Sequence, residues 1–390
     1  RRAAVLEELR SQGPVLVVDG GDLFWKSRVL SKARSAQQLE KARLQAAAYA
    51  ASGIDVFVPG EGDYSLGGEV ALGLIKTSGL PMLSAGLVCG EERWPGQQVF
   101  ERGGVRLGII GVSAEAPEGC VVADPVDAVS AAVLEQGPVD ARLVVVHGTA
   151  EEVKRIGALE SVDFVLDGHA RKTWVDPRSI GGSGAYELGA GSRGKRLGIL
   201  SLQLEKEGAG WSPQGQQTGR HGFAHRVVDL DGSIGEHAET QKLVEEAKAL
   251  IGAAVVPEQA VAQSAVAGPF VGSSACLSCH PAQYAQWRTT PHATAMDTLR
   301  NVNRAADLDC FACHVTGSHH PLGPQHPAQV GVLEDVGCES CHGPGQAHVA
   351  SPGASTIQRG AEPGTCRACH DGVKDGGRFD WETYLPKVMH

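Results

Sequence analysis

The amino-acid sequence predicts two unlike domains, an α/β domain followed by a mainly helical, loop-rich one. From residue 1 to about 230, apolar runs typical of buried strands alternate with helical segments, which is the pattern of an α/β domain. In the last third of the chain, the string Cys-x-x-Cys-His occurs four times. Residues 252–270 have no helical or strand period and contain two prolines, so they predict a linker. We therefore expect domains at 1–251 and 271–390.

The first domain is expected to begin with an amphipathic helix at Arg1. A buried strand at 15–22 then ends in a glycine turn, and a helix at 33–52 stops before Gly53. The later elements are a strand and loop at 54–67, a hairpin at 99–112 that turns at Gly103 and Gly104, buried strands at 142–148 and 163–169, two hairpins within 197–230, and a helix at 236–251. The two buried strands each end in a polar residue, at the edge where α/β sheets place their ligands.

The overall charge excludes two classes of partner. The chain has 390 residues and a formal net charge of −10. Nucleic acids and anionic membrane surfaces attract clustered lysine and arginine, so this chain is not expected to bind either. No run approaches the roughly 20 apolar residues of a membrane-spanning helix.

The four Cys-x-x-Cys-His strings have the spacing of c-type haem attachment. Two cysteines three positions apart bond the porphyrin edge covalently, and the following histidine reaches the iron. The attachment cysteines are Cys276, Cys279, Cys310, Cys313, Cys338, Cys341, Cys366 and Cys369. The proximal iron ligands are His280, His314, His342 and His370. The strings use eight of the ten cysteines, so we predict four haem c groups.

Zinc is the alternative ligand, because paired Cys-x-x-Cys strings also form zinc sites. Zinc would leave the histidine after every second cysteine unexplained. It would also leave unexplained why ten of the 15 histidines follow Phe270. Beyond the four proximal ligands, six histidines are available as distal iron ligands: His292, His319, His320, His326, His348 and His390. The surplus of histidine favours haem.

The amino-acid sequence and the order of the segments around these strings resemble the cytochrome c-554 family of tetrahaem proteins, over about 270–390. The resemblance implies electron transfer by packed haems with mostly bis-histidine ligation, although members with one open haem are known. His292, His348 and His390 match family-type distal ligands. For the haem on Cys310 and Cys313, the resemblance leaves two outcomes open. Either one of His319, His320 and His326 is the ligand, or the site is open.

Residues 1–230 resemble the calcineurin-type metallophosphatase and 5′-nucleotidase superfamily, and Asp22, His147 and His169 match its metal ligands. Other family positions differ. Glu61 stands in the place of the bridging asparagine, Gly62 in that of the catalytic histidine, and Arg171 in that of the second histidine of the Gly-His-x-His pair. The first strand of the family, with its Asp-x-His ligands, does not occur in the sequence. A two-metal phosphoesterase needs both ions, so we expect a degenerate domain that retains at most a single weak metal site at the three matching residues.

The expected location is periplasmic or extracellular, because bacteria attach haem covalently outside the cytoplasm. No signal peptide begins the sequence, so we expect further residues upstream of Arg1, which could include a membrane anchor. Cys89 and Cys120 are the only cysteines outside the four strings. In an oxidising compartment they predict a disulfide.

The predicted function is electron transfer between a redox donor protein and an acceptor protein, along four closely packed haems. The degenerate phosphatase-like domain would then serve docking or assembly. Three alternatives are a redox enzyme that acts on a small nitrogen or sulfur compound at an open haem, a homo-oligomeric subunit of a conducting filament, and an active phosphoesterase with a haem tail.

The first testable prediction is the haem content. Because each Cys-x-x-Cys-His string attaches one porphyrin, the pyridine haemochrome assay should give close to four haems per polypeptide. A content of two or fewer, or stoichiometric zinc in place of iron, would contradict the haem interpretation.

Overall fold

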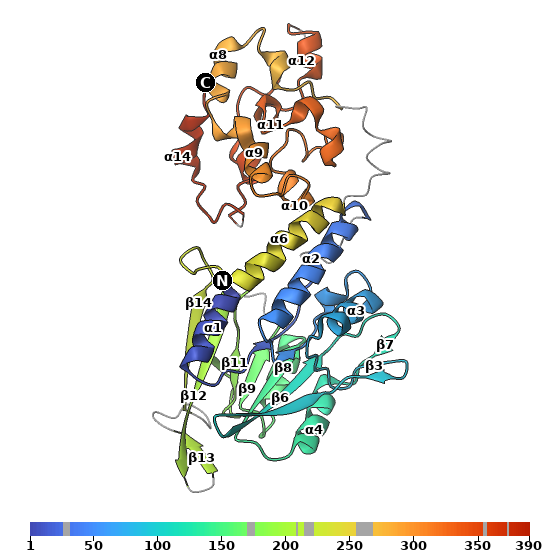
Figure 1. The fold of residues 1–390 in the computed structure, drawn as a ribbon, viewed down its shortest axis with the longest axis vertical. Helices are drawn as coiled ribbons and strands as arrows, with labels where there is room; N and C mark the ends of the chain where they lie inside the picture. The colour runs from blue at the N-terminus through green and yellow to red at the C-terminus, as the bar shows by residue number, and fades with distance from the viewer. Residues whose placement is uncertain are drawn as a thin grey trace. The chain divides into compact units, whose positions relative to one another are not determined.

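A computed structural model describes residues 1–25, 32–169, 176–207, 210–213, 222–254, 268–353, 357–372 and 374–390 (Figure 1). The chain divides into two compact units. The first comprises Arg1–Leu30 and Lys41–Glu245, and the second comprises Ser31–Glu40 and Glu246–His390. The second unit therefore includes 31–40 and 246–251, which the sequence analysis assigned to the first domain. Most of the expected linker, 255–267, lies outside the described residues.

A six-stranded mixed sheet forms the centre of the first unit. Its order is β10 (Arg178–Ser179), β11 (Tyr186–Leu188), β9 (Phe164–Asp167), β8 (Ala141–His147), β6 (Val105–Ser113) and β5 (Gln97–Arg102). Neighbouring strands from β11 to β6 are parallel, and β10 and β5 pair antiparallel at the two edges. The β5–β6 hairpin turns at Gly103 and Gly104, as predicted; both have positive φ, which glycine adopts without steric cost.

The central strands are buried on both faces, as their near-continuous apolar runs predict. Alternate side chains point to opposite faces of a sheet. Val144 and Val146 of β8 pack with α4 (Pro125–Gln136) and α5 (Ala150–Gly157), while Val145 packs on the other side with Val56 and Val58. Val56 belongs to β2 (Val56–Phe57), which pairs parallel with β1 (Val18–Asp19). The predicted strand at 15–22 is thus only two residues long.

Smaller elements complete the first unit. Helix α1 (Arg2–Gln12) begins the chain, and α3 (Gly68–Ser78) follows the β2 loop. The two hairpins expected within 197–230 form one antiparallel sheet of β13 (Gly210–Pro213), β12 (Arg196–Glu207) and β14 (Gly222–Asp229). A third sheet consists of β4 (Glu92–Arg93), β3 (Val88–Cys89) and β7 (Cys120–Val121). A disulfide joins Cys89 to Cys120 across it, as predicted.

Two long helices contribute residues to both units. The predicted helix at 33–52 is α2 (Lys32–Ala51), and that at 236–251 is α6 (Ala238–Ala253). Within the second unit, the side chain of Gln37 is buried, donates hydrogen bonds to the carbonyls of Ile251 and Ala306, and accepts one from the N–H of Leu308. Hydrogen bonds thus join the start of α2 and the end of α6 within the second unit.

The second unit is helical and rich in loops. Its helices are α8 (Pro281–Trp287), α9 (Ala295–Arg300), α10 (Leu308–Phe311), α11 (Cys338–His342), α12 (Gln346–Ala350), α13 (Pro363–Arg367) and α14 (Trp381–Tyr384), with short 3-10 turns between them. Its main cluster of buried apolar side chains is small: Met296, Leu299, Phe311, Val315 and Val330. No described helix of either unit is long and apolar enough to cross a membrane.

Candidate haem and metal sites

Each Cys-x-x-Cys-His string lies on a short helical turn. The His280 N–H donates to the Cys276 carbonyl at 2.9 Å, and the His370 N–H donates to the Cys366 carbonyl at the same distance. One turn of helix brings positions i, i+3 and i+4 to one side. This local geometry holds two thiols and one imidazole together, as attachment and ligation of one porphyrin require.

Three of the four string histidines face a histidine that is distant in the sequence. The ring centroids are 6.4 Å apart for His280 and His348, 6.3 Å for His292 and His370, and 5.6 Å for His342 and His390. Metal–imidazole bonds of about 2 Å, with about 1.2 Å from each nitrogen to its ring centre, would separate two rings on one metal ion by roughly 6.4 Å. The first two separations fit one iron between the rings, and the separation of His342 and His390 is shorter than this distance.

His314 is the exception. Among the residues that the structure describes, no aromatic or imidazole ring lies against His314. Its Nδ1 lies 2.7 Å from the carbonyl of Ala295, which can only accept, so Nδ1 carries the proton and Nε2 is the nitrogen that could bind a metal ion. His342 has the same arrangement, with Nδ1 2.7 Å from the carbonyl of Gln358.

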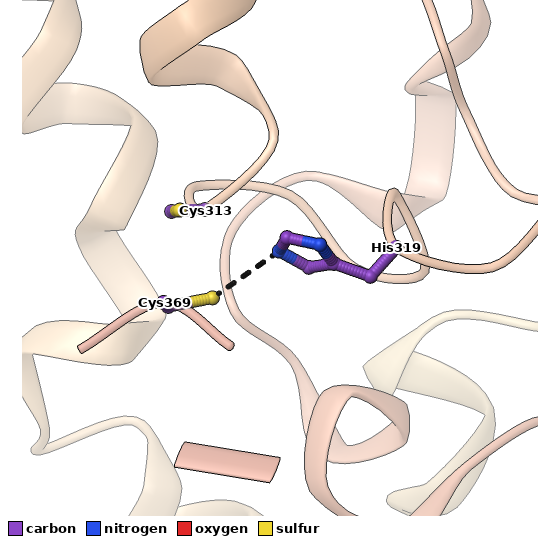
Figure 2. A group of neighbouring side chains, drawn as sticks. All are labelled: Cys313, His319 and Cys369. Carbon is purple, nitrogen blue, oxygen red and sulfur yellow. Dashed lines mark hydrogen bonds between the residues drawn. The ribbon is translucent and has the colours of Figure 1, made fainter. Parts of the chain in front are cut away.

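None of the three histidines considered for the fourth haem is paired ring to ring with His314 among the described residues. Figure 2 shows His319 beside cysteines of two different strings: its Nε2 lies 3.5 Å from Sγ of Cys369, and Cys313 belongs to the same group. His320 packs edge-on against Phe270. His326 caps a 3-10 turn by accepting the N–H of Ala328.

Cysteines of different strings are also neighbours. Sγ of Cys313 and Sγ of Cys369 lie within 4.8 Å of each other, and a hydrogen bond between the thiols lowers the pKa of Cys313 to about 5. A thiol–thiol hydrogen bond likewise lowers the pKa of Cys338 to about 6, with Cys276 as the partner. Cysteines of separate strings are therefore close together.

Glu339, the second residue of its string, is a buried carboxylate that shapes this unit. It accepts hydrogen bonds from the N–H groups of Val271, Gly272 and Gly345. One carboxylate thus joins the start of the unit to the loop after α11. The sequence analysis did not single it out, because the partners are main-chain groups distant in sequence.

In the first unit, the predicted Asp22, His147 and His169 come together at the carboxyl ends of β1, β8 and β9, where α/β sheets place ligands. Nε2 of His147 lies 3.6 Å from Oδ1 of Asp22 and 3.2 Å from Nδ1 of His169. Arg171 lies outside the described residues.

Glu61 belongs to the same cluster, and the sequence analysis does not predict this. Its carboxylate lies 2.6 Å from Nε2 of His147 and 3.0 Å from Nδ1 of His169. In the sequence, Glu61 marks only the loss of an asparagine. Its residue type could have indicated the cluster, since a carboxylate at a ligand position can itself be a ligand.

Gly62 and Asp22 fit closely together. The Gly62 N–H donates to Oδ1 of Asp22 at 2.8 Å, and a Cβ at Gly62 would lie 2.4 Å from the same oxygen. A histidine at this position, as in the phosphatase-like family, would therefore require Asp22 to move. The absence of that histidine is consistent with the local packing.

Asp63 holds the loops of the cluster in place. It is fully buried, and its two carboxylate oxygens accept four backbone N–H groups, from Gly60, Asp22, Leu23 and Phe24. Its main-chain carbonyl accepts the indole N–H of Trp25. Burial outweighs these donors and raises the pKa of Asp63 to about 6.

Comparison with known proteins identifies a cytochrome segment in the second unit. Residues 275–343 match the family model "Cytochrome c554 and c-prime". Cytochrome c-554 of Nitrosomonas europaea is 41% identical over 64 residues, which cover 13% of this chain and 27% of that protein. This segment of the chain is thus similar to cytochrome c554. The match spans about a quarter of that relative.

The first unit has the calcineurin-like phosphoesterase fold. The sulfate thiohydrolase SoxB of Thermus thermophilus aligns with a TM-score of 0.51 at 18% identity, over 72% of this chain and 53% of that one. The calcineurin-like phosphoesterase YfkN of Bacillus subtilis aligns at 0.50 and 18%, over 65% and 89%. A 5′-nucleotidase precursor of Thermus thermophilus aligns at 0.51 and 16%, over 72% and 61%. At these identities the likeness shows the fold alone.

The second testable prediction concerns Asp63. In Asp63→Asn, one oxygen becomes an NH₂ group and two buried N–H groups lose their acceptor, so the first unit should lose about 2 to 4 kcal/mol of stability. Calorimetry at pH 8, above the raised pKa of Asp63, should show a lower melting temperature for the first unit. The transition of this unit is the one during which the haem Soret band does not change. The exposed Asp127→Asn is the control and should melt like the wild type. Equal melting of the two variants would contradict the assigned role.

Proposed function

We propose that the protein is an extracytoplasmic tetrahaem c-type cytochrome that passes electrons between a donor and an acceptor protein. The observation that carries this proposal is the combination of four Cys-x-x-Cys-His turns with three histidine pairs 5.6 to 6.4 Å apart. When bound, haem c supplies one-electron redox chemistry whose potential depends on the axial ligands. A periplasmic or cell-surface location follows from where haem is attached.

Each group of residues would have a separate role in holding the haems. The eight string cysteines attach the porphyrins, and His280, His314, His342 and His370 are the proximal ligands. His348 is the distal ligand opposite His280, His292 that opposite His370, and His390 that opposite His342, in agreement with the facing rings.

The neighbouring cysteines support an order of electron transfer. Cys276 of the first string contacts Cys338 of the third, and Cys313 of the second lies beside Cys369 of the fourth (Figure 2). Burial raises the pKa of Cys341 of the third string to about 11, and the nearby Cys366 of the fourth string adds to this rise. These three contacts favour a chain of sites in the order first, third, fourth, second.

A second candidate function follows from His314. Because it faces no imidazole among the described residues, its haem would be five-coordinate and open to a small molecule. The protein would then act as a redox enzyme on a small nitrogen or sulfur compound at this site. The position of His314 in the second string makes it the end of the proposed chain of sites, where electrons would leave or enter.

The first unit would serve docking or assembly without hydrolysis. Gly62 provides no general acid, and Asp22 occupies the space beside it. Association into homo-oligomers or filaments is compatible with this role but is supported by no described contact.

The third testable prediction is the ligation of the four haems. EPR and absorption spectra of the oxidised protein should show three low-spin haems and one high-spin haem. In His348→Ala a second haem should become high-spin, because His280 loses its partner. The control His320→Ala should leave the spectrum unchanged, since this ring packs on Phe270. Four low-spin haems in the wild type would contradict the open site, and an unchanged His348→Ala spectrum would contradict the pairing.

The fourth testable prediction is the absence of phosphoesterase activity. With manganese, zinc or magnesium added, hydrolysis of nucleotide and aryl phosphates should not exceed background, because the acid at Gly62 is missing. The rate of haem reduction should be the same in Asp22→Ala as in the wild type. Turnover that disappears in His147→Ala would show that the first unit is an active enzyme.

A further inference from the structure

Asp375 places a buried carboxylate oxygen beside the histidine of the fourth string. Oδ2 of Asp375 lies 3.9 Å from Nδ1 of His370, and this oxygen has no hydrogen-bond partner among the described residues. The side chain of Asp375 is only 14% exposed. A buried carboxylate oxygen without a donor costs free energy, so its position beside the ring requires an explanation.

The turn after the fourth string holds this carboxylate against the ring. Gly376 and Gly377 both have positive φ, which glycine adopts without steric cost. The N–H of Gly377 donates to Oδ1 of Asp375 at 3.0 Å, which fixes the carboxylate and leaves Oδ2 beside His370. Phe379 stacks on the His370 ring, with centroids 4.6 Å apart and 18° between the planes. One short segment thus contacts this imidazole both on its face and at Nδ1.

The neighbouring cations do not pair with this carboxylate. Nζ of Lys374 donates to the main-chain carbonyl of Asp309 at 2.9 Å, and Nε of Arg378 donates to the main-chain carbonyl of Asp375 at 2.8 Å. Among the described residues, the carboxylate of Asp375 has its one ion-pair contact with His370. The negative charge of Asp375 therefore acts mainly on this imidazole.

The strings differ in the group that lies at Nδ1 of their histidine. His314 and His342 have neutral main-chain carbonyls there, at 2.7 Å, whereas His370 has a carboxylate. At 3.9 Å the contact is about 1 Å longer than a hydrogen bond, so in this geometry it acts through the charge of Asp375. A carboxylate at the remote nitrogen of a metal-bound imidazole orients the ring and makes it a more basic ligand. A more basic ligand favours the oxidised iron and lowers the reduction potential.

We propose that Asp375 is a positioning residue that orients His370 and lowers the reduction potential of the haem on the fourth string. This inference rests on the proposed function, because it needs a haem on Cys366 and Cys369 with His370 and His292 as its ligands. In the proposed chain of sites, the fourth haem stands next to the second. A lowered potential at the fourth site favours transfer of an electron from there to the second, whose histidine has a neutral carbonyl as its partner.

The experiment uses the full chain with its haems and measures the four midpoint potentials by spectroelectrochemistry at constant pH. In Asp375→Asn, which keeps the shape and removes the charge, the equilibrium constant for reduction of one haem should rise at least tenfold, a shift of about 59 mV for a one-electron couple. The other three potentials should stay at their wild-type values. Asp375→Ala should shift the same potential in the same direction, and Asp375→Glu, which keeps the charge, should remain closer to the wild type. The control Glu382→Gln, an exposed position on α14, should leave all four potentials unchanged.

A second measurement assigns the shift to the fourth string. In His292→Ala the iron bound to His370 loses its distal ligand, so the resonance Raman spectrum of the reduced protein should gain one iron–histidine stretching band. Adding Asp375→Asn to this variant should lower the frequency of that band, because a less basic imidazole forms a weaker bond to iron. A residue that only stabilised the fold would not lower it.

The outcomes separate this inference from the proposed function. Haem missing from the fourth string of the wild type would overturn the proposed function and this inference with it. Unchanged potentials and an unchanged stretching band in Asp375→Asn that carries all four haems would overturn the inference alone, and the electron carrier would stand.

Discussion

The second unit depends on the spacing within Cys-x-x-Cys-His. In the proposed cytochrome, two thioether bonds and one iron ligand would come from a single helical turn of each string. The apolar cluster of this unit contains five buried side chains, and its helices from α8 to α14 are only four to seven residues long. Helices of this length are not stable alone. The unit therefore needs other sources of order, and covalently attached porphyrins would supply both crosslinks and apolar surface.

Buried carboxylates play a comparable role in both units. Asp63 gathers four backbone N–H groups at the ends of β1 and β2, and Glu339 gathers those of Val271, Gly272 and Gly345. In each case one acidic side chain satisfies donors from loops that lack regular hydrogen bonds. These hydrogen bonds fix the loops that lie beside the candidate ligand residues.

The two units differ in how their ligand residues are brought together. In the first, the sheet does so: Asp22, Glu61, His147 and His169 follow separate strands whose carboxyl ends share one edge. In the second, one set of candidate ligands is local in sequence and the other comes from distant positions, such as His348 on α12 and His390. A chain that combines a calcineurin-like fold with a cytochrome c554-type segment thus holds its two kinds of site by different means.

Local patterns in the sequence determined the four Cys-x-x-Cys-His strings, the α/β character of the first unit and the β5–β6 hairpin, because each of these depends on residues a few positions apart. The resemblance to the metallophosphatase family identified Asp22, His147 and His169. The tertiary structure alone decided which histidines face each other, that Glu61 joins His147 and His169, and that the start of α2 is bonded into the second unit through Gln37. These contacts connect residues far apart in the chain, and no local period or spacing records them. Glu61 illustrates the difference: its position was visible in the sequence, but its role depends on two strands packing beside it.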